Sequence, residues 1–144
     1  MIVKDPIVNS SRDNIVRMLP KVILVVEDIE EIRDGIERLL KADGYRVHTA
    51  RDENDAISWA RRIKPDLILV SPGTPAKLVI TKALRIRKRA GLGEAVPIVI
   101  FTVDTLAEGA EVESQRRIYL TRPDNFDQLR RFLRRVLEPR DSAS

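Results

Sequence analysis

The stretch Val22-Ile23-Leu24-Val25-Val26, followed at once by Glu27-Asp28, decides the fold of this 144-residue chain. Five β-branched or aliphatic residues in a row predict a strand that is apolar on both faces, as in the middle of a parallel sheet. Apolar residues then recur at positions 29, 32, 36, 39 and 40, the spacing of one helix face, until Asp43-Gly44 ends the helix. The stretch therefore predicts the first strand and helix of an α/β fold.

The same alternation continues along the chain. Further strands are expected at 45–49, 67–70, 97–101 and 118–120, and further helices at 56–63, 78–89, 106–115 and 126–137. Five strand–helix alternations predict a parallel sheet with helices on both faces. The pattern defines a domain over residues 21–138, with an N-terminal extension at 1–20 and a C-terminal tail at 139–144. The extension is expected either to be disordered or to dock on the domain or on a second copy.

Composition excludes several classes of protein. Hydrophobic residues make up 43% and charged residues 33% of the chain, the balance of a soluble globular domain. There is no cysteine, which excludes disulfides and thiolate metal sites. No apolar run approaches the roughly 20 residues of a membrane-spanning helix, so a cytoplasmic protein is expected.

The formal net charge is +4, and arginines gather in two clusters, at 85–89 and 130–135. Both clusters fall on expected helices. They are either solvated faces or contacts for an acidic protein or a nucleic acid.

Ligands of such a sheet bind beyond the carboxyl ends of its strands. The residues that follow those ends are therefore the candidate site. They comprise acids, hydroxyls and one cation: Glu27 and Asp28 after the first strand, Ser71 after the third, Thr102 and then Asp104 after the fourth, and Thr121, Arg122 and Pro123 after the fifth.

In this order the sequence resembles the receiver domain of two-component signalling, over about residues 21–138. The motifs that carry the resemblance are 22–28, 64–70, Pro75 four residues after Ser71, 97–102 and 119–123. The resemblance implies a flavodoxin-like, doubly wound, five-stranded parallel sheet, (βα)5, with strand order 2-1-3-4-5. It also implies a signalling module rather than an enzyme.

The resemblance assigns roles to the acidic end of the site. The family's acidic pair after the first strand helps to bind Mg²⁺, and Glu27 and Asp28 match it. The family's phosphoacceptor aspartate follows the third strand, where this chain has Ser71.

Further roles follow the last two strands. Thr102 matches the family's hydroxyl that bonds the phosphoryl group, and Tyr119 matches the aromatic residue that changes rotamer on activation. Arg122, before Pro123, stands where the family has a phosphoryl-contacting lysine before a cis-bonded proline.

The two replacements work against phosphoryl chemistry. A serine hydroxyl is neutral and needs a neighbouring base to attack phosphorus, and the single histidine, His48, lies on the second strand. Asp66 begins the third strand, roughly 16 Å from its far end at about 3.3 Å per residue, so only Asp104 could substitute. Ser71 is then either a small residue that fills the vacated site or a residue that becomes a phosphoserine.

With one carboxylate fewer, Mg²⁺ is expected to bind weakly if at all, and no other cofactor is expected. Arg122 is expected to lie across Glu27 or Asp28 and to replace the metal with an ion pair.

Three functions compete. The first is a receiver that is not phosphorylated on the usual aspartate and acts on a signalling kinase or output protein. It would use the face of the fourth helix, fifth strand and last helix, where the arginines at 130, 131, 134 and 135 would meet an acidic partner or the second subunit of a homodimer. The second is a nucleic-acid-binding regulator, which 4% aromatic residues and the lack of a recognised binding motif disfavour. The third, an enzyme, lacks a cofactor loop and a nucleophile–base pair.

Overall fold

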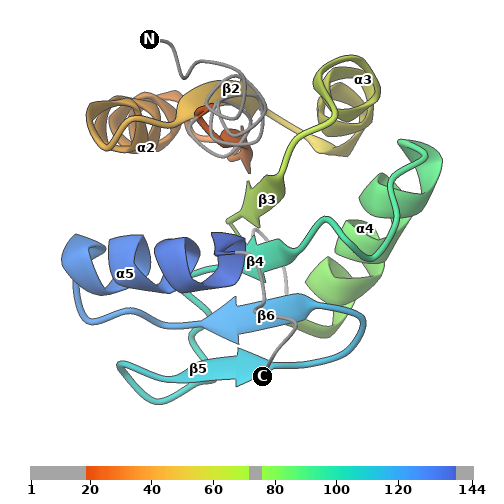
Figure 1. The fold of residues 1–144 in the computed structure, drawn as a ribbon. Helices are drawn as coiled ribbons and strands as arrows, with labels where there is room; N and C mark the ends of the chain where they lie inside the picture. Colours follow the sequence, from red (N-terminus) through yellow and green to blue (C-terminus); the bar gives the residue numbers. More distant parts are fainter. Residues whose placement is uncertain (1–18, 72–75, 139–144) are drawn as a thin grey trace, which may run out of the picture.

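A computed structural model describes residues 19–71 and 76–138, which form one sheet with helices on both faces (Figure 1). The sheet order is β2-β1-β3-β4-β6-β5, and all neighbours are parallel except β5 and β6. The strands are β1 (Val22–Val26), β2 (Arg46–Ala50), β3 (Leu67–Val70), β4 (Ile98–Ile100), β5 (Glu111–Glu113) and β6 (Ile118–Thr121). The predicted strand order 2-1-3-4-5 is confirmed, because β2, β1, β3, β4 and β6 lie side by side in that order and are parallel. Strand β6 is the fifth strand of the expected fold, and β5 is an additional strand beside it.

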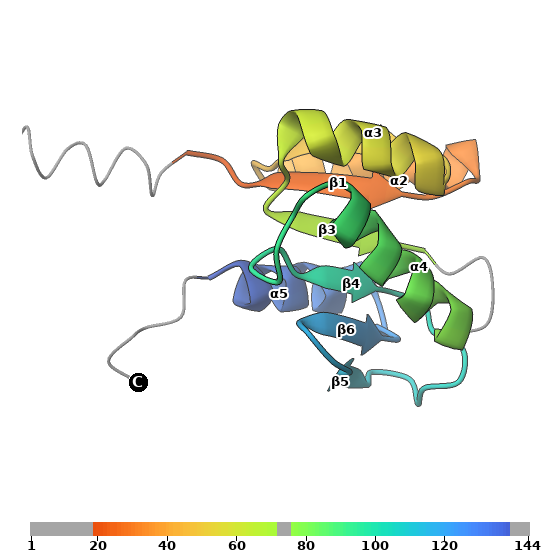
Figure 2. The same cartoon turned by 90° about the vertical axis from the view of Figure 1, so that its right-hand side faces the viewer.

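Four helices cover this part of the chain: α2 (Glu30–Ala42), α3 (Glu53–Ile63), α4 (Ala76–Arg89) and α5 (Phe126–Leu137). Helices α2 and α5 lie on one face of the sheet, and α3 and α4 lie on the other (Figures 1 and 2). The layering is that of a doubly wound α/β fold, as expected.

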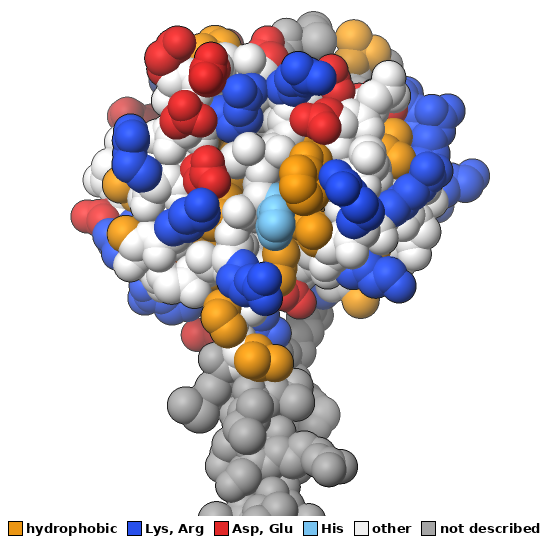
Figure 3. Space-filling view, turned by 90° about the horizontal axis from the view of Figure 1, so that it is seen from above, with side chains coloured by type: hydrophobic (Ala, Val, Ile, Leu, Met, Phe, Trp, Pro, Cys, Tyr) orange, Lys and Arg blue, Asp and Glu red, His pale blue; other side chains and the backbone are white. Residues whose placement is uncertain are grey.

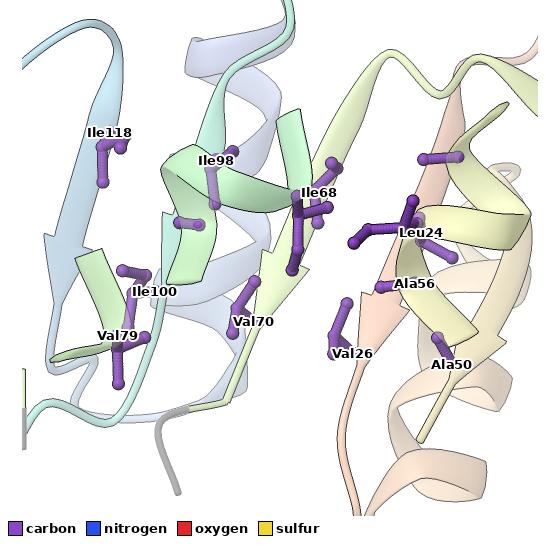
Figure 4. Close-up of a cluster of buried hydrophobic side chains, with 14 of the residues drawn as sticks. Leu24, Val26, Ala50, Ala56, Ile68, Val70, Val79, Ile98, Ile100 and Ile118 are labelled. Atoms are coloured by element: carbon purple, nitrogen blue, oxygen red, sulfur yellow. The ribbon is translucent and has the colours of Figure 1, made fainter. Parts of the chain in front are cut away.

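Two apolar layers hold the helices to the sheet. Towards α3 and α4, strand residues such as Leu24 and Ile68 pack against Ala56 and Val79 (Figure 4). Towards α2 and α5, the opposite side chains of the same strands pack against Ile36, Leu40, Leu129, Phe132 and Leu133. Because strand side chains alternate between faces, a strand apolar at every position can serve both layers.

Polar residues begin two of the helices. The side chain of Asp52 accepts a hydrogen bond from the Asp55 amide at the start of α3, and Asn125 accepts one from Gln128 at the start of α5. Such caps satisfy amides that have no partner within the helix.

The prediction of a helix at 106–115 is wrong. Gly109 adopts a φ of +84°, and residues 111–113 form β5, an antiparallel edge strand beside β6. The amide of Arg122 and the hydroxyl of Thr121 both donate to the Ala110 carbonyl, which ties this segment to β6. The alternation Glu-Val-Glu suits an edge strand, and a glycine with positive φ breaks a helix.

Most of the expected extension and tail lies outside the described residues, as do positions 72–75, which include Pro75. The domain boundaries therefore stay predictions. Within the described ranges, no helix has the length and apolarity needed to cross a membrane.

Candidate functional site

Parallel register brings the candidate residues to one edge of the sheet. Val26 of β1 lies level with Val70 of β3, which lies level with Ile100 of β4, and Ile100 pairs with Leu120 of β6. The arrowheads of β1, β4 and β6 point to this edge in Figure 2. The residues that follow these four strands therefore share one edge, as the sequence predicted.

Glu27 is buried and serves the backbone. Its Oε2 accepts a hydrogen bond from the Ile29 amide at 3.0 Å, and its carbonyl accepts one from Arg33 Nη1 at 3.0 Å. Ile29 is the N-cap of α2 and has no side-chain cap of its own, so the Glu27 carboxylate stabilises the positive end of that helix. Asp28, by contrast, is exposed.

These residues do not fit a resident Mg²⁺. Within the described part of the chain, no group of three or more His, Cys, Asp or Glu side chains could hold a metal ion. Glu27 and Asp28 supply two carboxylates, and one oxygen of Glu27 is already bonded to an amide. Mg²⁺ needs hard oxygen ligands in a near-octahedral arrangement, and a serine hydroxyl in place of a carboxylate is a poor third ligand.

Ser71 sits directly after β3, half-buried, and its amide donates to the Val26 carbonyl at 3.0 Å. No described residue makes a hydrogen bond to its hydroxyl. His48 lies on β2, separated from β3 by β1, and packs against Trp59 with 4.9 Å between ring centroids. Asp104 is exposed on the loop after β4 and makes no hydrogen bond to Ser71. Among the described residues, therefore, no carboxylate or imidazole is hydrogen-bonded to this hydroxyl as a general base would be.

Thr102 uses its hydroxyl locally. Its Oγ1 donates to the carbonyl of Phe101 at 2.6 Å, and its backbone has a φ of +59°. That conformation is rare for a β-branched residue and costs conformational energy. The side chain is exposed beyond β4, and its role as a phosphoryl contact stays a prediction.

Arg122 does not form the expected ion pair. Its Nη1 donates to the carbonyl of Leu106 at 3.0 Å, and neither Glu27 nor Asp28 lies within ion-pair distance. The carbonyl is within reach because the chain before β5 forms a loop where a helix was expected. The Arg122–Pro123 peptide bond is trans, whereas the resemblance implies a cis bond.

Tyr119 is a core residue of β6. It is only 9% exposed, and its ring meets Phe132 of α5 edge to face, with centroids 5.7 Å apart and an interplanar angle of 81°. The ring thus adds to the packing between β6 and α5. A switch by this residue would need that contact to break.

Two arginines of the last helix are already paired. Arg130 donates to both oxygens of Asp43, at 2.5 and 2.7 Å, and to Asp127 at 2.9 Å. The hydrogen bonds to Asp43 are the main cause that raises the pKa of Arg130, and the hydrogen bond to Asp127 adds to it. Arg135 pairs with Glu111 of β5. The contact with Asp127 follows helical spacing, but Asp43 is 87 residues away and nothing in the sequence marks it as a partner.

Sequence reasoning also missed Arg87 of α4. Only 3% of its surface is exposed, and burial lowers the pKa of its guanidinium. Its Nη1 donates to the carbonyl of Val96 at 3.1 Å. A buried arginine has no signature in the sequence, where position 87 is one of five basic positions in the run from Lys82 to Arg89.

Known proteins resemble the chain over most of its length. It is 32% identical over 122 residues to the sensor histidine kinase AruS of Pseudomonas aeruginosa, covering 79% of this chain and 12% of that kinase. It is 30% identical over 129 residues to the response regulator MprA of Mycobacterium tuberculosis, covering 84% of this chain and 54% of that regulator. The chain thus spans only part of each of these relatives.

A solved structure shares the fold. The receiver domain of the sensor histidine kinase PA1611 from Pseudomonas aeruginosa, which has a magnesium ion coordinated in its active site cleft, is 27% identical. The alignment covers 82% of this chain and 98% of that one, with a TM-score of 0.59. Residues 23–134 also match the family model described as the response regulator receiver domain. The expected resemblance is confirmed, and the chain belongs to the response regulator receiver domain family.

Proposed function

We propose that this chain is a receiver domain that works without aspartyl phosphorylation and acts by binding other proteins. The observation that carries the proposal is a serine, Ser71, directly after β3, where the resemblance implies the phosphoacceptor aspartate of the family. A serine there removes both the nucleophilic carboxylate and a ligand for Mg²⁺.

The surroundings of Ser71 support the same proposal. Glu27 caps α2, Thr102 bonds its neighbouring carbonyl, and Arg122 bonds Leu106. Each of these side chains therefore has a local partner that competes with a phosphoryl group. Phosphoryl transfer depends on groups positioned around the transferred phosphorus. Because these three side chains are engaged in local hydrogen bonds, the site is less suited to phosphoryl transfer.

The proposed partner is a signalling kinase or an output protein, and a homodimer is a further possibility. The surface expected for this contact lacks its fourth helix, so β5, β6 and α5 form it instead. Arg131 and Arg134 of α5 are exposed and form no ion pair with a described residue. These two cations, rather than Arg130 and Arg135, are available to an acidic partner on this surface.

The test is the intact mass of the protein after incubation with a small-molecule phosphodonor and Mg²⁺. We expect no phosphoryl adduct, because no described residue is hydrogen-bonded to the Ser71 hydroxyl as a base. An ordinary receiver domain, treated in parallel, serves as the control and should gain the adduct.

Two results would contradict the proposal. An acid-stable adduct mapped to Ser71 would show that this serine accepts a phosphoryl group. An acid-labile adduct would show that a carboxylate, with Asp104 the first candidate, still does so.

A further inference from the structure

Two hollows flank the C-terminal half of α4, on the face of the sheet away from α2 and α5. The first, of about 430 Å³, lies over α3 and reaches Arg89, and its lining includes Ile57, Arg61 and Arg62. The second, of about 440 Å³, lies on the other side of α4. Its lining includes Leu84, Arg85, Arg87, Lys88, Leu92 and Arg116. We call the two hollows together the α3–α4 basic surface.

Most positive charge on the α3–α4 basic surface is not cancelled. Arg85 pairs with Glu53, and Arg116 lies 3.8 Å from Glu94. Among described residues, no ion pair involves the remaining cations of the two hollows: Arg61, Arg62, Arg87, Lys88 and Arg89. Seen from above in Figure 3, Lys and Arg side chains gather on the right, the side on which Figure 1 places α3 and α4.

Hydrogen bonds and packing hold several of these cations without neutralising them. Arg61 Nε donates to the carbonyl of Arg89 at 2.9 Å, which ties the end of α3 to the end of α4. The guanidinium of Arg62 lies 4.4 Å from the centre of the Trp59 ring, a cation–π contact. Side chains held in this way lose less conformational entropy when they bind an anion.

Arg87 adds a buried charge to the wall of the second hollow. Its Nη1 donates to the neutral carbonyl of Val96, and no carboxylate among the described residues lies within ion-pair distance of it. Glu94 lines the same hollow and acts on Arg87 only from a longer distance. A buried cation with so little counter-charge is unfavourable, and a carboxylate that entered this hollow would add to it.

The last helix makes a useful contrast. Arg130 and Arg135 are neutralised by Asp43, Asp127 and Glu111, so half of the arginine cluster on α5 is already satisfied within the chain. The α3–α4 basic surface is therefore the larger source of uncompensated positive charge among the described residues.

The lining also indicates what kind of anion would fit. Leu84 and Leu92 lie beside the cations of the second hollow, and Ile57 lies beside those of the first. A nucleic-acid backbone presents phosphates without apolar side chains between them and gains most from aromatic stacking platforms. An acidic peptide can place carboxylates on the arginines and apolar side chains on the leucines.

We infer that the α3–α4 basic surface is a docking site for an acidic segment of a partner protein that carries apolar residues between its carboxylates. The inference rests on the proposed function, since it names the chemistry of a partner of the same interaction module. It uses a face of the molecule different from the edge that holds Ser71.

The test is fluorescence anisotropy of a labelled synthetic peptide in which glutamate and leucine alternate, at low and at physiological ionic strength. The variant K88Q/R89Q removes two exposed, unpaired cations from α4. It should bind the peptide about tenfold more weakly than the wild type, as expected for two lost charge pairs. The matched control, R38Q/R46Q, removes two exposed cations from α2 and β2 that form no ion pair with a described residue, and it should bind as the wild type does.

Four outcomes would overturn the inference. The first is no binding of the peptide at millimolar concentration, and the second is an equal loss of peptide affinity in K88Q/R89Q and in the control variant. The third is a glutamine–leucine peptide that binds the wild type as tightly as the glutamate–leucine peptide does. The fourth is a DNA duplex that binds the wild type more tightly than the peptide does and no longer binds K88Q/R89Q. Circular dichroism of each variant checks that the fold is intact.

The peptide experiment contains no phosphodonor, so its result does not depend on whether Ser71 can be phosphorylated. If the peptide binds here and the separate intact-mass experiment finds a phosphoryl adduct at Ser71, the proposed function is rejected but the docking surface is supported.

Discussion

At the scale of single residues, the proposed function depends on the side chain at position 71. The strand before it, the backbone hydrogen bond that joins its amide to the Val26 carbonyl, and the acids at Glu27 and Asp28 are all in place. In the proposal, this position lacks one carboxylate, and with it a nucleophile and a metal ligand.

The variant S71D should therefore gain affinity for Mg²⁺. A third carboxylate beside Glu27 and Asp28 adds a hard, anionic ligand, and we expect binding at least about tenfold tighter than in the wild type. Isothermal titration calorimetry measures the change. The control S114D adds the same charge to an exposed turn at the opposite edge of the sheet and should leave the affinity unchanged. Equal affinities in S71D and wild type would show that position 71 does not limit metal binding.

At the scale of elements, the replacement of a helix by β5 is the largest departure from the expected fold. The turn that leads into β5 depends on Gly109, whose φ of +84° favours glycine. A Cβ added there would also lie 3.4 Å from the carboxylate of Asp124. This turn places the Leu106 carbonyl where it accepts a hydrogen bond from Arg122. The position of the Arg122 side chain therefore depends on the same loop that leads into β5.

We expect G109A to lower the free energy of unfolding by about 1 kcal/mol or more, because alanine is strained at positive φ. The matched control is G35A in the middle of α2, where a Cβ meets no atom within 4 Å. That variant should raise the free energy of unfolding by roughly 0.4–1 kcal/mol. Urea unfolding of both variants measures the difference, and a stabilising G109A would refute this account of the turn.

The ion pair between Glu53 and Arg85 joins α3 to α4, with N–O distances of 2.5 and 2.6 Å. The hydrogen bond from Arg85 is the main cause that lowers the pKa of Glu53. A carboxyl with a lowered pKa stabilises the fold above its unfolded pKa, and this contribution disappears as the pH falls through the folded pKa.

The variant E53Q should therefore be less stable than the wild type at neutral pH, and the two should converge in acid. Urea unfolding across a pH series measures this. E113Q, at an exposed glutamate of β5 without an ion pair to a described residue, should show no such pH-dependent difference. A gap between E53Q and wild type that stays constant down to acid pH would contradict the assignment.

At the scale of the whole molecule, the sequence predicts what depends on local pattern. Runs such as Val22–Val26 and Leu67–Val70 mark buried parallel strands, and the carboxyl ends of those strands locate the candidate site. The helix expected at 106–115 fails because a weak local pattern lost to pairing with β6, a tertiary interaction.

Long-range charge pairing is equally hidden from the sequence. Asp43 and Arg130 meet only because α2 and α5 cover the same face of the sheet, and Arg122 finds Leu106 only because β5 exists. The two arginine clusters look alike in the sequence, yet two of the four arginines on α5 are paired, whereas in the cluster on α4 only Arg85 forms an ion pair with a described residue. Charge available for a partner is thus a property of the folded molecule.

The central claim, a receiver fold whose phosphoacceptor edge does not switch, is tested most directly by the backbone amide NMR spectrum recorded before and after addition of Mg²⁺ and a small-molecule phosphodonor. We predict that the two spectra superimpose at Glu27, Ser71, Thr102 and Arg122 and at Tyr119 in the core beside them. Shifts that begin at Ser71 and Thr102 and extend through β6 to Tyr119 would contradict the claim, because they would show that the edge accepts a phosphoryl group and transmits its presence to the core.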